Sequence, residues 1–151
     1  MKSSSVKLGV ILIGLLFLGN AEVWGADWKL LETISEEIYF YDAESITRPS
    51  KDIVRVWSKL AFTEEGVKQW VKEFKKELLD QKKGWPKKFE KLDNMLTLFE
   101  YNCPDRTFRI LTIDYYSKDG LVIESFNYDK PNLMFIRPET VENILYKAVC
   151  K

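Results

Sequence analysis

The chain has 151 residues, 23 basic and 23 acidic side chains, and no histidine. This length suits one domain with its own core, and the balanced charge argues against binding to nucleic acid or membranes through net charge. The lack of histidine removes the commonest general base, the Ser–His and Cys–His nucleophile pairs, and the usual zinc and haem ligands.

Residues 1–26 have the pattern of a secretory signal peptide. Two lysines flank a polar start, an apolar run covers residues 8–18, and small residues occupy positions 19, 21, 25 and 26. The run is about half as long as a bilayer-spanning helix, which disfavours the alternative of an uncleaved membrane anchor. We expect cleavage after Ala21 or Gly25 and one mature domain over residues 27–151, located in the periplasm or at the cell surface.

The first half of this domain shows the two-residue period of strands. Short strands are predicted over 28–33 and 38–41, and a longer one over 53–63. In the longer strand, Val54 and Val56 share an apolar face, while the other face carries polar residues around Trp57. These strands predict a sheet with one buried face.

From Glu64 the apolar residues recur at helical spacing, which predicts a helix that ends at Gly84. Four lysines on its polar arc and a tryptophan in the following loop form a candidate partner-binding patch: Lys68, Lys72, Lys75, Lys76 and Trp85. Two interpretations stay open. The lysines either solvate the outer face of an amphipathic helix, or they bind an anionic partner.

Strand patterns return over 94–103, 107–116 and 121–128, and a final helix is predicted over 140–149. Together the elements predict an α+β domain, with an antiparallel sheet of about six strands, a mid-chain helix and a C-terminal helix. No repeat or flexible linker divides it, so we expect a single domain.

The turn around Asp119 and Gly120 allows two hairpin registers. A three-residue turn would place Asp114 opposite Glu124, where two like charges either repel or share a cation. A two-residue turn would place Asp114 opposite Ser125. The second register is favoured, because it separates apolar from polar side chains and avoids the repulsion.

Cys103 and Cys150 are the only cysteines. In an exported protein, such a pair favours a disulfide over two free buried thiols. The bond would tether the C-terminal helix to the end of a strand. By closing a loop of about 48 residues, it would stabilise the fold by roughly 4 kcal/mol in the chain-entropy model.

Catalytic patterns are weak. A Ser–Lys pair could replace histidine in acyl transfer, but in Ser58-Lys59 and Ser117-Lys118 the neighbours point to opposite faces of a strand. Closely spaced glycines of the kind that bind phosphate do not occur in the mature chain. We therefore expect no enzymatic activity, no cofactor and no metal site.

Several motifs, taken in chain order, carry a family resemblance: Trp28, Tyr41-Asp42 with Ser45-Ile46, Val54-Arg55-Val56-Trp57, Cys103, Tyr115-Tyr116 before Asp119-Gly120, and Pro138 through Cys150 with its closing Leu-Tyr-x-Ala-Val-Cys. In this order they resemble the surface-adhesin protein E family of bacterial exported domains. The resemblance covers nearly all of residues 27–151. It implies a small antiparallel sheet with a disulfide-tethered C-terminal helix, and a surface protein that binds host extracellular-matrix and serum proteins.

The leading functional hypothesis is thus a non-enzymatic binding domain of the bacterial envelope. Its expected partner is a protein rather than a nucleic acid. We expect no transmembrane helix after removal of the signal peptide. Dimerisation through a sheet edge is a further possibility. The alternative is a periplasmic structural or envelope-maintenance protein without an adhesive role. A small hydrolase that uses carboxylates is a third, weaker hypothesis.

Overall fold

The computed structural model describes residues 26–80 and 87–151. The strands and helices are β1 (Trp28–Ile34), β2 (Glu37–Asp42), β3 (Ile53–Phe62), α1 (Glu64–Asp80), β4 (Leu92–Asn102), β5 (Thr107–Ser117), β6 (Val122–Asn127), β7 (Met134–Phe135) and α2 (Val141–Val149). Two short 3₁₀ turns precede β3 and β4, over Ala43–Ser45 and Lys87–Lys91. None of the helices in the described ranges is long and apolar enough to cross a membrane.

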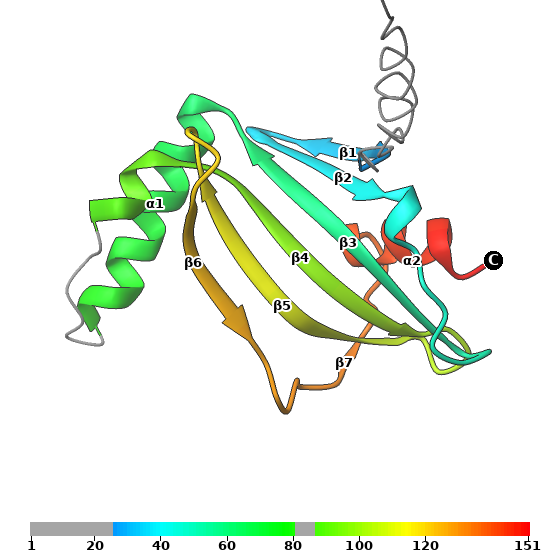
Figure 1. Cartoon of the computed structure of the whole chain (residues 1–151). Helices are drawn as coiled ribbons and strands as arrows, with labels where there is room; N and C mark the ends of the chain where they lie inside the picture. Colours follow the sequence, from blue (N-terminus) through cyan, green and yellow to red (C-terminus); the bar gives the residue numbers. More distant parts are fainter. Residues whose placement is uncertain (1–25, 81–86) are drawn as a thin grey trace, which may run out of the picture.

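The seven strands form one antiparallel sheet in the order β1-β2-β3-β4-β5-β6, and β7 pairs with β5 beyond the end of β6 (Figure 1). Each strand of the main path neighbours the strand that precedes it in the chain. The predicted α+β class, with an antiparallel sheet of about six strands and two helices, is confirmed. The predicted signal peptide lies outside the described residues except for Ala26, so export stays a prediction.

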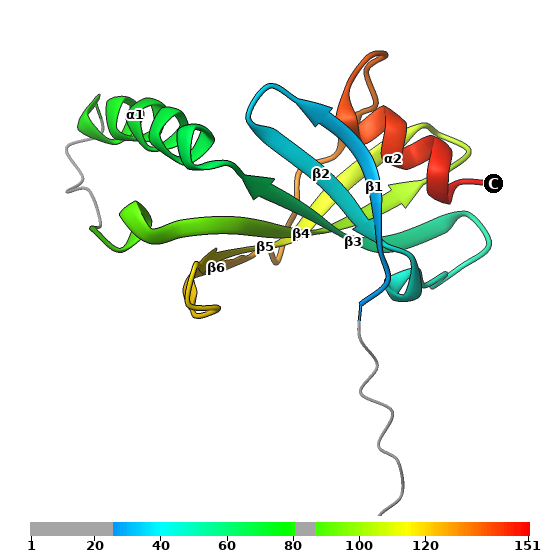
Figure 2. The same ribbon diagram turned by 90° about the horizontal axis from the view of Figure 1, so that it is seen from above.

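Both helices lie on the same side of the sheet (Figure 2). The covered face includes Val54 and Val56 of β3, which pair with Tyr101 and Phe99 of β4 and are fully buried. Their alternation with polar residues is therefore the signal of a buried sheet face, as predicted.

Helix α2 closes the core at one end of this face. Leu145 and Val149 are buried against the cluster that contains Val54, Tyr101 and Phe108. The Thr140 side chain caps the helix by accepting a hydrogen bond from Asn143 N at 3.3 Å. A helix this short does not persist alone in water, so its position depends on these contacts.

The disulfide holds the same helix from its C-terminal end. Cys103 and Cys150 are bonded, with their Cα atoms 5.6 Å apart. The Tyr146 hydroxyl also donates to the Cys103 carbonyl at 3.0 Å, and Arg48 Nη2 donates to the Val149 carbonyl at 3.0 Å. The predicted tether between the C-terminal helix and the sheet is thus present.

Helix α1 covers the other end of the same face. Trp70 packs among Phe62, Phe89 and Tyr115, with ring centroids 5.8–6.0 Å apart. The helix begins where predicted, because Thr63 Oγ1 accepts from Gly66 N at 3.1 Å as the N-cap. The structure describes α1 as far as Asp80, and the predicted end of the helix at Gly84 lies outside the described residues.

The β5–β6 hairpin confirms one part of its prediction and corrects another. Asp114 pairs with Ser125, as the favoured register requires. The turn, however, has three residues: Ser117 N donates to the Leu121 carbonyl, and Gly120 adopts a φ of 74°. The three-residue turn and the Asp114–Ser125 pair are compatible because the register shifts between Tyr115 and Tyr116, where a bulge adds one residue to one strand.

Candidate functional site

The face of the sheet opposite the two helices is covered by no described element (Figure 2). We call it the open face. Its side chains stand in rows across neighbouring strands, and the two central rows are Phe40–Lys59–Leu96–Asp114–Ser125 and Trp57–Leu98–Thr112–Asn127. Aromatic and aliphatic side chains therefore lie among polar ones across the middle of this face, partly exposed to solvent.

Most charges of the open face are already paired. Arg55 Nε and Nη2 both lie 2.8 Å from Glu100 Oε2. The Lys59 ammonium lies 4.4 Å from the Trp28 ring centroid and 5.0 Å from that of Phe40. Such contacts orient the cation over the ring faces and keep both rings at the surface.

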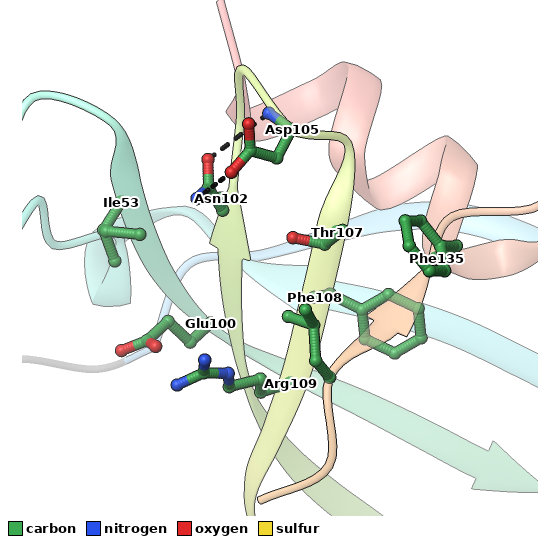
Figure 3. Close-up of a pocket in the computed structure, with 9 residues that line it drawn as sticks. Ile53, Glu100, Asn102, Asp105, Thr107, Phe108, Arg109 and Phe135 are labelled. Carbon is green, nitrogen blue, oxygen red and sulfur yellow. Dashed lines mark hydrogen bonds between the residues drawn. The ribbon is translucent and has the colours of Figure 1, made fainter.

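A hollow of about 510 Å³ lies at one end of the open face (Figure 3). It is lined by residues of β3, β4, β5 and the β7 segment: Ile53, Glu100, Asn102, Asp105, Thr107, Phe108, Arg109, Leu133 and Phe135. The strand registers explain this grouping, because Ile53, Asn102, Thr107 and Phe135 form a single row. We call it the β7 hollow.

The two sides of the β7 hollow differ in chemistry. Leu133 and Phe135 form an apolar wall, and they are 54% and 75% exposed. On the polar side, the Asn102 amide donates to Asp105 Oδ2 at 2.8 Å, while the guanidinium of Arg109 lies in the next row (Figure 3). Such a hollow can bind a group that is apolar on one side and polar on the other.

The candidate lysine patch lies elsewhere. Lys68 and Lys72 are exposed on α1, on the helix-covered side of the sheet, and Lys68 Nζ pairs with Glu65 Oε2 at 3.1 Å. Lys75 and Lys76 belong to the same helix, but their side chains, like the whole of Trp85, lie outside the described parts of the structure. The structure therefore does not bring Lys68 and Lys72 together with the β7 hollow.

The carboxylate site that a hydrolase would need is not formed by the hairpin. Asp114 accepts a hydrogen bond from the Ser125 hydroxyl at 2.5 Å, and Glu124 is paired in register with Tyr115. Within residues 26–80 and 87–151, no three His, Cys, Asp or Glu side chains are grouped so that they could hold a metal ion.

Three tyrosines on the covered side have raised pKa values: Tyr101, which is buried, and Tyr39 and Tyr115, which are partly buried. Burial is the main cause for Tyr101 and for Tyr39, and Glu142 and Glu37 respectively add to the effect. The Tyr101 hydroxyl donates to the Glu142 carbonyl at 3.2 Å, which makes it a structural group rather than a site for ligands.

Sequence reasoning identified the polar face around Trp57 but missed the β7 hollow. Neither Leu133 nor Phe135 belongs to a periodic pattern, and the two residues of β7 are too few to show one. The available signal was the apolar run from Leu133 to Ile136, of which only Ile136 is buried.

A family model described as surface-adhesin protein E matches residues 28–151. No curated protein matches the sequence. Among solved structures, crystal form II of Haemophilus influenzae protein E is similar at 14% identity and a TM-score of 0.45, covering 80% of this chain and 91% of that one. Protein E from non-typeable Haemophilus influenzae has 14% identity and a TM-score of 0.48, covering 80% and 74%.

Proposed function

Because the chain belongs to the surface-adhesin protein E family, we propose that its mature domain is an exported, non-enzymatic binding module of the bacterial envelope. In this proposal the open face binds a protein partner. The observation that carries it is the uncovered face itself, on which Trp57 and Leu98 lie side by side in one row.

The composition of the open face supports a protein partner. Protein interfaces are enriched in aromatic residues and arginine, and their charges are paired rather than free. The open face provides Trp28, Phe40 and Trp57, and its Arg55–Glu100 pair is already formed. A partner that binds there would therefore cover aromatic surface without having to strip water from many unpaired charges.

The absence of histidine, the commonest general base, supports the non-enzymatic part of the proposal. The full sequence has no histidine. The carboxylate of Asp114 accepts a hydrogen bond from the Ser125 hydroxyl across the hairpin. Export rests on the signal pattern of residues 1–26, and dimerisation through a free sheet edge stays a prediction that analytical ultracentrifugation of residues 27–151 would test.

The experiment uses purified residues 27–151 immobilised for surface plasmon resonance. Extracellular-matrix proteins, serum proteins and an envelope extract are passed in turn over the wild type, over a Trp57→Thr/Leu98→Thr variant, and over Lys72→Gln as a control on the opposite side. Threonine keeps the strand preference while it removes the large apolar surface.

Saturable binding that the double variant loses, and that Lys72→Gln keeps, would support the proposal. Binding to envelope components alone would favour the alternative, a structural role in the envelope. Unchanged binding by a folded double variant would rule out the open face.

A further inference from the structure

We infer that the β7 hollow is a docking site for an extended peptide segment of the partner, in which an acidic side chain lies between apolar ones. This inference rests on the proposed function, since it specifies the chemistry of the partner at one end of the open face. Three independent features of the hollow point to such a peptide: an unpaired strand edge, an unpaired cation and an exposed apolar wall.

The first feature is the outer edge of β7. Ile136 N donates to the Arg106 carbonyl at 3.1 Å, so the backbone groups of Ile136 point towards β5. Because successive residues of a strand point their N–H and C=O groups in opposite directions, those of Phe135 point away from β5. With the described residues, the backbone of Phe135 makes no hydrogen bond on that side. Such an edge is a template for one more strand.

The second feature is the charge of Arg109. Its side chain is exposed and lies in the same row as Glu100, but the Glu100 carboxylate is occupied by Arg55. Among the described residues, Arg109 has no ion pair or hydrogen-bonding partner for its guanidinium. A carboxylate offered by a ligand would therefore meet guanidinium N–H groups that have no partner among the described residues, and arginine–carboxylate pairs are among the stronger hydrogen bonds.

The third feature is the wall formed by Leu133 and Phe135. These side chains lie two residues apart in an extended segment, so they project on the same side, towards the hollow. They are also among the most exposed large apolar residues of the chain, at 54% and 75%. Apolar side chains of a bound strand would cover this surface.

The hollow also orients the peptide. Asp105 lies at the opposite end from Arg109, beyond Thr107, and its carboxylate accepts from Asn102 (Figure 3). This anion repels an acidic group, so the carboxylate of the ligand belongs at the Arg109 end. At the Asp105 end, backbone N–H groups of the peptide can donate to the Asp105 carboxylate.

The test uses a fluorescein-labelled, capped peptide of sequence Thr-Leu-Thr-Glu-Thr-Leu-Thr, which as a strand places leucine and glutamate on one face. A matched peptide has glutamine in place of glutamate. Fluorescence anisotropy measures the binding of both to residues 27–151 and to four variants: Arg109→Gln, Phe135→Thr, Phe135→Pro and, as the control, Gln69→Ala, at an exposed position of α1.

The wild type is expected to bind the glutamate peptide at least about tenfold more tightly than the glutamine peptide, as for a charged hydrogen bond. Arg109→Gln should abolish this preference without loss of folding, because the side chain is exposed. Phe135→Thr should weaken both peptides. Phe135→Pro should weaken them further, because it also removes the outward N–H of the edge. Gln69→Ala should leave the binding of both peptides unchanged.

Failure to bind either peptide, equal binding of the two, or a preference that survives Arg109→Gln would overturn the inference. In each of these cases, protein binding that still depends on Trp57 and Leu98 would leave the proposed function intact. Circular dichroism of each variant confirms that a loss of binding is not a loss of fold.

Discussion

Gly66 of α1 lies directly against the carbonyl oxygen of Glu36 in the turn between β1 and β2. A β-carbon at position 66 would stand 2.6 Å from that oxygen. The Thr63 hydroxyl donates to the Glu36 carboxylate at 2.5 Å, and Thr63 N donates to the Glu36 carbonyl at 3.0 Å. The first turn of α1 and the β1–β2 turn therefore form one joint.

Replacing Gly66 with alanine should destabilise the domain. In an open helix this change stabilises by about 1 kcal/mol, because alanine has the higher helix propensity. Here the added methyl group meets a backbone oxygen that cannot rotate away, which should cost about 1–3 kcal/mol. Thermal melts followed by circular dichroism should show a lower Tm for Gly66→Ala and little change for Gln69→Ala, an exposed control in the same helix. An unchanged or higher Tm for Gly66→Ala would show that the joint is not tight.

The Cys103–Cys150 bond should contribute a large share of the stability. It joins residues 47 positions apart in the chain, and α2 is too short to persist once released. The Cys150→Ser variant should lose roughly 4 kcal/mol in urea unfolding, according to the chain-entropy model. Mass spectrometry without reduction should show the mature mass lowered by two hydrogens. Two thiols that alkylate freely in protein from its native compartment would contradict this prediction.

Stability should fall in alkaline solution because of the buried tyrosines. Burial raises the pKa of Tyr101 above its ordinary value of 10.0, so the folded state keeps a proton that the unfolded state releases. The contribution of the protonated Tyr101 hydroxyl to the free energy of unfolding is therefore complete below pH 10, and it is lost as the pH rises above 10. Urea unfolding should show a loss of about 1 kcal/mol from Tyr101 between pH 10 and 11. Tyr101→Phe should make this slope shallower, and an identical slope in that variant would assign the effect to other groups.

The exposed lysines of α1 should prove dispensable. Among the residues that the structure describes, Lys68 pairs only with Glu65 of its own helix, and both side chains are more than half exposed. Exposed pairs of this kind contribute about 0–1 kcal/mol, so Lys68→Gln/Lys72→Gln should keep both its Tm and its protein binding. A loss of binding that also depends steeply on salt would instead support the anionic-partner interpretation of the patch.

The sequence predicted those features that depend on local periodicity. Val54 and Val56 alternate with polar residues, and they are buried. The pairing of Asp114 with Ser125 also followed from the separation of apolar and polar side chains. The three-residue turn at Gly120 could not be predicted from this separation. The register shift between Tyr115 and Tyr116 gives the Asp114–Ser125 pair, so this pairing does not reveal the length of the turn.

The β7 hollow could not be predicted for a different reason. Its row of Ile53, Asn102, Thr107 and Phe135 exists only when four strands are aligned in their actual registers. The strand β7 has only two residues, which is too short for a periodic pattern. The sequence also does not show that the guanidinium of Arg109 lacks a partner among the described residues. A site whose residues come from several aligned strands is thus harder to predict from the sequence than a core whose residues alternate along one strand.

The central claim is that the open face binds a protein, and surface plasmon resonance on residues 27–151 tests it most directly. The account predicts saturable binding to an extracellular-matrix or serum protein, weakened at least about tenfold by Trp57→Thr/Leu98→Thr, as expected for the loss of a central aromatic contact. Lys72→Gln should bind as the wild type does. Full binding by a folded double variant would contradict the account.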